Sequence, residues 1–446
     1  MNSAPHSLPG QQESRWSKRR RWGARAIFAV LDQGLISGSN FLLGIQLARS
    51  LHPAGYGAYA LAFSIFSLLL VLDQAIVLEP MSVFGGSKYS GLLRRYLGEL
   101  LKFQSILSGV CLSLLLVAAL GIGISRQSSD LYVALLGIGI ATPSILLLYF
   151  TRRALYLEYR SSAAAGGAVL YCVLLFSGLW LVDHLGLISA FSAFLCMGAA
   201  ALATSSLLMI YIRPRLKSKG RESEFQIVNE HWNYGRWALG SSAFMWISWN
   251  VWYTIVGSLS GLAGTGTLKA WMNLAMPVIQ SCAALSLLVL PHTSRVVHVE
   301  GWAGAKRQAL TVASLFTAGA TVYWVVVLTC HKPIIAFLYS GRYADGMASL
   351  QWLALASIAS AASIGPVSAL RALEKPSTVC AAYFVSSVAG LGAGIPATRI
   401  YGVSGAIAGV LIASLLALAL AVYMLVRAAP RQARSCALAM SETVLQ

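Results

Sequence analysis

Long apolar runs, each broken by charged residues, glycine or proline, follow one another along almost the whole chain. Each run is close to the roughly 20 residues that a helix needs to cross a bilayer. Reading the chain for such runs predicts twelve membrane-spanning helices. They lie at residues 26–51, 56–78, 103–124, 131–150, 163–182, 187–212, 237–259, 267–290, 309–328, 347–370, 381–396 and 403–426.

The longest polar interruption follows the sixth run and divides the runs six plus six. A faint sequence repeat agrees with this division, because SLHPAGYG (Ser50–Gly57) follows the first run and SLSGLAGTG (Ser258–Gly266) follows the seventh. Such traces are typical of parallel repeats in transporters, whose substrate site lies between the halves. Gly-rich turns also resemble one another by chance, so the motif alone leaves both interpretations open.

The pattern therefore predicts an all-α integral membrane protein with about 12 transmembrane helices in two six-helix bundles. Its expected parts are a basic cytoplasmic tail, an N-terminal bundle, a basic cytoplasmic linker, a C-terminal bundle and a cytoplasmic C-terminal tail. These parts span residues 1–25, 26–212, 213–236, 237–427 and 428–446.

The distribution of positive charge predicts the orientation of the helices in the membrane. Cytoplasmic loops collect Lys and Arg, and with the N-terminus inside, most of the 33 basic residues fall in the tails and cytoplasmic loops. Both termini are therefore expected in the cytoplasm. The net charge of +18 then needs no nucleic acid, and attraction to anionic membrane lipids is a secondary effect. The basic residues left on the other side are Arg49, Arg126, Lys269, Lys332, Arg342 and Arg399.

Composition narrows the classes of function. Only 11% of the residues are charged and 57% are hydrophobic, whereas a soluble domain is about a quarter charged, so no sizeable soluble domain is expected. No phosphate-binding GxxxxGK[ST] loop is present. The cysteines and histidines show no metal-ligand spacing, so we expect no metal and no cofactor. Catalysis is not expected either, although an integral membrane enzyme of glycan assembly remains a rival.

Two carboxylates lie inside the first two spans, each in a Leu-Asp-Gln triplet that includes Gln33 or Gln74. Asp32 and Asp73 sit roughly 8 to 10 Å deep from the cytoplasmic ends of their spans. At one depth they could share a proton or bind a coupling cation. Alternatively, each pairs with Arg25, Arg94 or Arg95 and holds a gate or anchors a helix.

Other polar residues in the spans suggest substrate contacts. Arg49 and Lys269 stand near the outer ends of the first and eighth spans, where they could meet a phosphate or simply extend to the interface. Trp246, Asn250 and Tyr253 share one face of the seventh span. That face could stack on sugar rings, but lipid contact or ordinary packing explains it too.

The chain resembles the multidrug/oligosaccharidyl-lipid/polysaccharide superfamily, which includes the multidrug and toxin extrusion (MATE) transporters. The residues that carry the resemblance are Leu31–Ile65, with LARSLHPAGYG and Tyr59, and Phe337–Leu355. They look most like the branch of polysaccharide exporters and O-antigen flippases. In that branch Arg49 matches a recurrent basic position at the end of the first span.

This resemblance implies a flippase in the bacterial inner membrane, where it moves a polyprenyl-pyrophosphate-linked oligosaccharide to the periplasmic leaflet for surface polysaccharide. Alternating access by rocking of the halves is the implied mechanism. Polymerase or export machinery is an expected partner. The alternative is a cation-coupled multidrug antiporter that would use Asp32 and Asp73, although Arg49 and Lys269 would repel a cationic substrate.

Overall fold

The structure, a computed structural model, describes residues 15–86, 89–125, 128–215, 221–343, 349–373 and 375–444, and every regular element in these residues is helical. The N-terminal elements are α1 (Arg15–Ser50), α2 (Pro53–Asp73), the π-helical turn η1 (Gln74–Leu78), α3 (Glu79–Gly86), η2 (Ser90–Leu92), α4 (Leu93–Ser125), α5 (Ser129–Leu157), α6 (Ser161–His184) and α7 (Ala190–Ile212). They are followed by α8 (Arg221–Thr329), α9 (His331–Tyr339), α10 (Leu350–Ala372), α11 (Pro376–Tyr401) and α12 (Val403–Val444).

The long element α8 is three helices in succession. The backbone leaves helical geometry at Gly261 (φ 75°) and at Gly301 (φ 61°), a region of positive φ that glycine enters without the steric cost of a side chain. Counted separately, the three parts of α8 bring the long helices of the described residues to twelve, six up to α7 and six from α8 onward. The predicted number and division of spans are confirmed.

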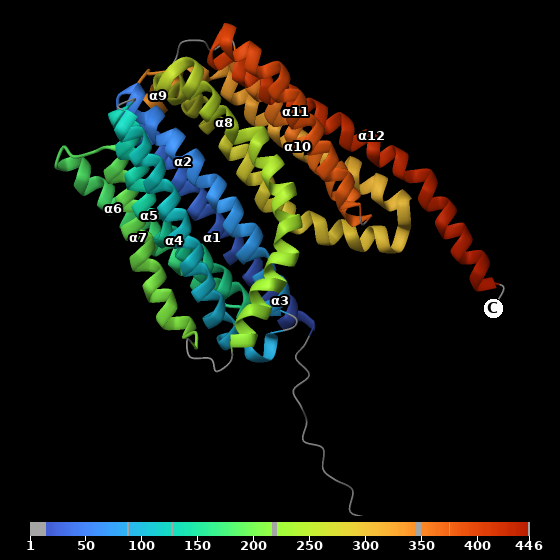
Figure 1. Cartoon of the computed structure of the whole chain (residues 1–446). Helices are drawn as coiled ribbons and strands as arrows, with labels where there is room; N and C mark the ends of the chain where they lie inside the picture. Colours follow the sequence, from blue (N-terminus) through green and yellow to red (C-terminus); the bar gives the residue numbers. More distant parts are fainter. Residues whose placement is uncertain are drawn as a thin grey trace, which may run out of the picture.

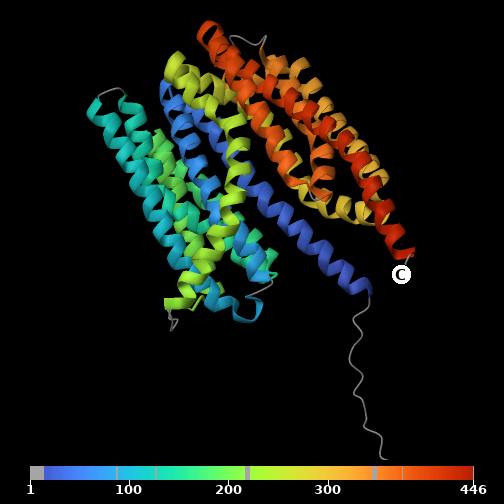
Figure 2. The same ribbon diagram turned by 45° about the vertical axis from the view of Figure 1, so that its right-hand side comes forward.

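The two sets of six helices form two bundles that lie side by side (Figure 1). Helices α1 to α7 make the N-terminal bundle and α8 to α12 the C-terminal one. The bundles meet closely at the end where α9 lies and diverge toward the opposite end, where α1 begins (Figures 1 and 2). Contacts between the bundles run mainly along α2 and α8, with α1 also touching α8 and α9.

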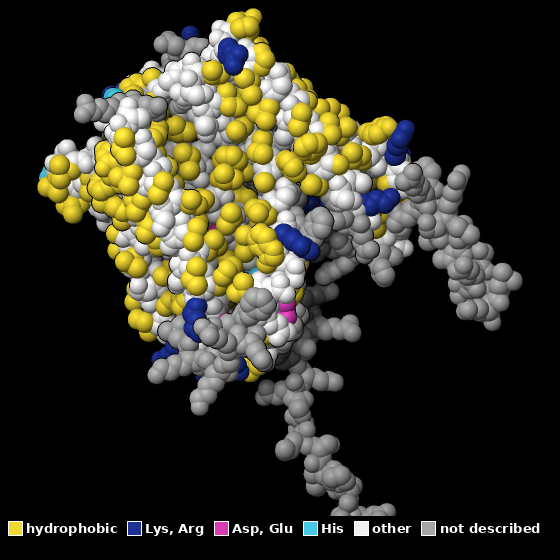
Figure 3. Space-filling model, in the orientation of Figure 1, with side chains coloured by type: hydrophobic (Ala, Val, Ile, Leu, Met, Phe, Trp, Pro, Cys, Tyr) yellow, Lys and Arg dark blue, Asp and Glu magenta, His cyan; other side chains and the backbone are white. Residues whose placement is uncertain are grey.

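The outer surface of the bundles is apolar, as is expected of a surface in contact with lipid. On α4 the side chains of Ile106, Val110, Leu114 and Val117 form a stripe at helical spacing, and each is at least half exposed. Hydrophobic side chains also dominate the face seen in Figure 3. Nine helices of the described residues are long and apolar enough to cross a membrane. The chain is therefore a multi-pass membrane protein.

Several helices extend beyond the predicted spans. Helix α5 continues to Leu157 instead of ending at residue 150, and α12 continues to Val444 through most of the predicted C-terminal tail. The predicted linker is also largely helical, because α8 begins at Arg221. Residues 1–14 of the expected N-terminal tail and 216–220 of the linker lie outside the described residues. Polar helix ends that emerge from the hydrocarbon keep their backbone hydrogen bonds, so a hydropathy pattern ends a helix too early.

Candidate functional site

The seam between the two bundles is built around a lysine. Lys269, on the second part of α8, points its Nζ at two aromatic rings, 5.4 Å from the ring centroid of Phe63 and 5.6 Å from that of Tyr253. Phe63 belongs to α2 and Tyr253 to the first part of α8, so the cation stands where the bundles meet. Within the described residues its ammonium group has no carboxylate partner. Lys269 and Tyr253, which the sequence suggested separately as substrate contacts, therefore lie side by side.

An aromatic row on α2 lines the same seam. The ring of Tyr59 stacks on Phe63 at 6.0 Å and on Tyr56 at 6.1 Å. The hydroxyl of Tyr56 accepts a 3.1 Å hydrogen bond from the Nδ2 of Asn273, one turn beyond Lys269. Of these three residues, only Tyr59 was singled out from the sequence, as one of the residues that carry the family resemblance. Tyr56 and Phe63 could have been found from the sequence, because residues 56, 59 and 63 share one helical face.

The other two residues of the predicted aromatic face pack along the same seam. Trp246 donates from Nε1 to the Ser67 hydroxyl at 2.7 Å. The backbone carbonyl of Asn250 accepts a 3.0 Å hydrogen bond from the Ser64 hydroxyl. Both serines are on α2, so Trp246 and Asn250 hold the first part of α8 against the N-terminal bundle. Among the described residues, no hydrogen bond or cation–π contact joins either of them to Lys269.

Arg49 lies in the last turn of α1. Its Nε donates to the carbonyl oxygen of Leu338 at 2.7 Å, and its guanidinium lies 5.6 Å from the ring centroid of Phe337. In return, Nη1 of Arg342 donates to the carbonyl oxygens of Arg49 and Leu51 at 3.0 and 2.9 Å. These reciprocal bonds fasten the C-terminal end of α1 to α9 and the turn after it, and so join the two bundles.

Asp32 is held in a buried ion pair inside the N-terminal bundle. Its carboxylate receives hydrogen bonds from Nε and Nη2 of Arg152 at 2.9 and 2.6 Å, and another from the hydroxyl of Tyr156. Asp32 is 1% exposed and Arg152 5%. The basic partners considered from the sequence, Arg25, Arg94 and Arg95, do not include Arg152. It was counted as a loop residue because the span was ended at residue 150, whereas α5 continues to Leu157.

Asp73 has a different environment. It is the last residue of α2, it is completely buried, and neither carboxylate oxygen forms a hydrogen bond. The neighbouring polar side chain is Gln104 on α4, also buried and without a hydrogen bond of normal geometry. Gln33 and Gln74 are exposed, and Gln33 donates to the Ser37 hydroxyl at 3.3 Å. No described contact joins Asp32 to Asp73.

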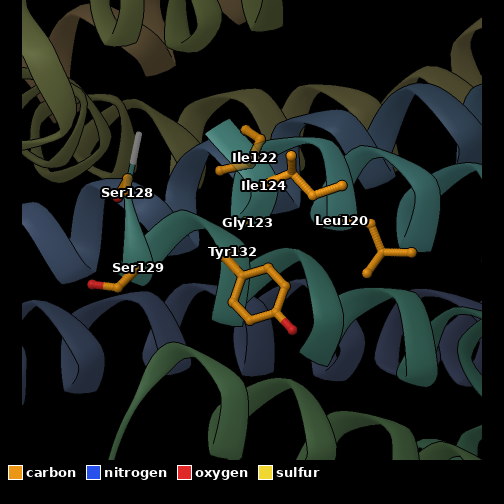
Figure 4. Close-up of a pocket in the computed structure, with 7 residues that line it drawn as sticks. All are labelled: Leu120, Ile122, Gly123, Ile124, Ser128, Ser129 and Tyr132. Atoms are coloured by element: carbon orange, nitrogen blue, oxygen red, sulfur yellow. The ribbon is translucent and has the colours of Figure 1, made fainter. Parts of the chain in front are cut away.

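Two further features bear on ligand binding. No group of three or more His, Cys, Asp or Glu side chains within the described residues is arranged to hold a metal ion. A pocket of about 790 Å³ opens at the turn between α4 and α5, lined by Leu120, Ile122, Gly123, Ile124, Ser128, Ser129 and Tyr132 (Figure 4). None of these lining residues is charged at neutral pH, and none of the predicted site residues is among them.

The fold resembles those of solved membrane transporters. The chain superposes on a multidrug resistance MATE family transporter in its inward-facing conformation with a TM-score of 0.75 at 13% sequence identity, covering 90% of this chain and 97% of that one. The chain has the MATE fold. Against an outward-facing conformation of a MATE family transporter the TM-score is 0.63, with 13% identity and coverage of 90% and 93%.

A third structure with the MATE fold is a transporter of the same MOP superfamily from Pyrococcus furiosus, for which a binding pocket of reverse polarity is described. Its TM-score is 0.65 at 13% identity, and the match covers 91% of this chain and 95% of that one. No family model matches the sequence. No curated protein matches it either.

Proposed function

We propose that this protein is an alternating-access transporter that flips a polyprenyl-pyrophosphate-linked oligosaccharide from the cytoplasmic to the periplasmic leaflet for surface polysaccharide biosynthesis. The observation that carries the proposal is the position of Lys269, at the seam between the bundles, against Phe63 and Tyr253 and with no carboxylate contact. An ionisable side chain at membrane depth is costly and marks a substrate pathway by default.

The chemistry of the seam favours an anionic, sugar-bearing headgroup. The ammonium group of Lys269 lies beside two aromatic rings and contacts no carboxylate among the described residues, so a pyrophosphate would supply the missing counter-ion. The rings of Phe63 and Tyr253 offer apolar faces on which a sugar could lie. The two carboxylates considered for a cationic substrate are placed elsewhere, Asp32 in its ion pair with Arg152 and Asp73 inside the N-terminal bundle.

Alternating access is supported by the two ends of the seam. The outer end is fastened by Arg49 and Arg342, whereas the bundles diverge at the other end (Figure 2). The higher TM-score against the inward-facing transporter agrees with this arrangement. A headgroup would enter the seam from the cytoplasm while its polyprenyl tail stays in lipid, and rocking of the bundles would then expose it on the opposite side.

This proposal places the protein in the bacterial inner membrane with both termini in the cytoplasm. It performs transport and no covalent chemistry. The lipid-linked oligosaccharide comes from cytoplasmic glycosyl transfer, and the flipped product is handed to polymerase or export machinery. Such machinery would be the partner protein.

The test is transfer of a fluorescent polyprenyl-pyrophosphate oligosaccharide in proteoliposomes, read by loss of signal to a membrane-impermeant quencher. Wild type should accelerate transfer, Lys269→Met should reduce it at least tenfold, and Lys269→Arg should retain part of it. Lys306→Met is the matched control, since Lys306 also faces an aromatic ring, Trp302 at 5.8 Å, away from the residues that form the seam. No acceleration by wild type would reject the flippase function.

A cation-coupled multidrug antiporter is the second candidate. It is favoured by the multidrug resistance transporters among the structural neighbours. In that case Lys269→Met should leave drug export intact or improve binding of cations, because it removes a like charge from the seam. Drug susceptibility of a deletion strain that carries wild type or Lys269→Met separates the two candidates.

A further inference from the structure

An apolar groove lies between α6 and α7, two neighbouring helices of the N-terminal bundle (Figure 1). It has a volume of about 360 Å³, and its lining includes Gly166 and Gly167 on α6 and Leu207, Leu208 and Tyr211 on α7. A methyl group on Gly167 would lie 2.9 Å from Cδ1 of Leu208, whereas one on Gly166 would have no atom within 4 Å. The two helices therefore touch at Gly167, and the space beside Gly166 is open.

The groove has the course and the size of a site for a hydrocarbon chain. Helix α6 begins and α7 ends at the side of the membrane that the positive charge predicts to be cytoplasmic. Ala163 and Tyr211 line the groove close to that side, and Leu170 lies about 10 Å deeper along α6. Leu207 and Tyr211 are 56% and 57% exposed, so the groove is open toward lipid. A helix with its side chains, at least 10 Å across, is too wide to enter it.

An arginine stands at the mouth of the groove. Arg160 is the residue before α6, and its guanidinium carbon lies 4.8 Å from the ring centroid of Tyr211. The side chain is 42% exposed, and its Nε lies 3.4 Å from the carboxylate of Glu158. An ion pair of this length with an exposed cation is weak. Arg160 can therefore meet an anion at the level where the groove reaches the membrane surface.

A second arginine lies at the same end of the groove. Arg213 follows the last residue of α7 in the left-handed conformation (φ 51°) and is exposed. The chain beyond it is held in place, because the backbone N–H of Arg215 donates to the carbonyl oxygen of Arg94 at 2.9 Å. Two cations beside an apolar groove match a molecule that carries an anionic headgroup on a hydrocarbon chain, and basic pockets between helices on the cytoplasmic side suit such lipids.

We propose that this groove binds one anionic phospholipid of the surrounding membrane, with an acyl chain along Gly166 and the headgroup phosphate at Arg160 and Arg213. The site is separate from the seam, whose contacts run mainly along α2 and α8, so it does not depend on the identity of the cargo. Helix α6 packs on α1 as well as on α7. A lipid that fills the groove therefore stabilises the N-terminal bundle.

Native mass spectrometry of delipidated protein in detergent, titrated with phosphatidylglycerol or phosphatidylcholine, tests the site. Wild type should bind the first phosphatidylglycerol at least tenfold more tightly than phosphatidylcholine. Gly166→Leu places a side chain in the open part of the groove and should weaken phosphatidylglycerol binding at least fivefold. Arg160→Gln should remove most of the preference between the two lipids. Equal affinity of wild type for both lipids would overturn the proposal.

Two matched variants show whether the groove itself is responsible. Gly109→Leu adds the same side chain to α4, where a methyl group also has no atom within 4 Å, and should bind both lipids as wild type does. Arg427→Gln removes a guanidinium that also lies 4.8 Å from a tyrosine ring, that of Tyr423 on α12, and should keep the preference. If Arg427→Gln loses as much as Arg160→Gln, the preference reflects general surface charge and the site is wrong.

Thermal unfolding in detergent supplies a second measurement. Phosphatidylglycerol should raise the unfolding temperature of wild type and of Gly109→Leu, and should raise that of Gly166→Leu and Arg160→Gln less than half as much. Arg160→Gln leaves the packing of the helices untouched, so it decides the question even where Gly166→Leu folds poorly.

Competition identifies the ligand. Inorganic phosphate and a polyprenyl phosphate, each at the concentration of the phospholipid, should not displace phosphatidylglycerol from wild type. Displacement by inorganic phosphate would reduce the site to a surface anion site without a bound acyl chain. Displacement by the polyprenyl phosphate would assign the groove to the tail of the cargo. Either result would overturn the assignment to a membrane phospholipid.

Discussion

Gly57 and Gly266 occupy matching positions in the two sequence repeats and pack against each other at the seam. A methyl group on Gly57 would lie 1.6 Å from the carbonyl oxygen of Leu262, and one on Gly266 would lie 2.6 Å from the carbonyl oxygen of Pro53. The repeated turns are therefore a contact between the bundles. Their glycines are required because no side chain fits between two backbones that approach so closely.

This contact predicts that Gly57→Ala or Gly266→Ala opens the seam at the end where α9 lies. The added methyl group should destabilise the state in which the α9 end of the seam is closed, by about 1–3 kcal/mol, the usual cost of overpacking. The measurement is the rate at which an impermeant maleimide added outside labels Asn273→Cys in a background without other cysteines. We expect faster labelling in either alanine variant. Gly38→Ala is the control, because a methyl group there has no atom within 4 Å, and equal rates in all three would contradict the prediction.

A second prediction concerns the outer fastening. Arg49→Ala removes the bond to the Leu338 carbonyl and the contact with Phe337, which should weaken closure by about 1–2 kcal/mol for a charged hydrogen bond at an exposed site. Labelling of the same cysteine should rise and substrate transfer should fall several-fold. Arg399 is an exposed arginine in the last turn of α11, and Arg399→Ala should change neither. Unchanged transfer in Arg49→Ala would remove Arg49 from the mechanism.

The ion pair of Asp32 with Arg152 makes a prediction about stability. Arg152→Met leaves a buried carboxylate without its cation, which costs roughly 3–5 kcal/mol, so thermal unfolding in detergent should occur at clearly lower temperature. Combining Arg152→Met with Asp32→Leu removes both charges and should recover most of the loss. Arg307→Met breaks an exposed pair with Glu300 and should have little effect. A double variant as unstable as the single one would show that the charges are not what matters.

Much of the fold could be predicted from the sequence, because apolar runs and basic loops report directly on a bilayer. The division into six plus six followed from one polar interruption, and the contact of Gly57 with Gly266 was foreshadowed by the repeated turns. The ends of the helices were harder to predict from the sequence. Arg152 was assigned to a loop since hydropathy falls before α5 ends, although its backbone continues as helix to Leu157.

The site was predicted less completely, because partners across a seam leave no mark on local spacing. Lys269 and Tyr253 were named separately, but Phe63, which contacts the same ammonium group, was not. The shared Leu-Asp-Gln triplet suggested one environment for Asp32 and Asp73. The structure gives them two, since one has an arginine from α5 and the other has none.

The beginning of α8 makes the last prediction, which concerns pH. His231 lies in the expected cytoplasmic linker, where it is fully buried, and its Nε2 lies 2.7 Å from the hydroxyl of Tyr96. Burial lowers the pKa of His231 from 6.5 to about 4. Between these values the unfolded chain binds the extra proton and the folded protein does not, so stability falls as the pH drops from about 6.5 toward 4. At pH 5 the loss should be roughly 2 kcal/mol relative to pH 7.5.

Thermal unfolding in detergent at several pH values measures this loss. His231→Gln retains an amide that can bond to Tyr96 and to the Ile76 carbonyl but cannot titrate, so its unfolding temperature should depend less on pH in this window. His292→Gln is the control, because His292 is exposed and its ring contacts Gln308. If His231→Gln and wild type lose stability in parallel, other groups cause the acid sensitivity, and His231 serves only to pack α8 on η1.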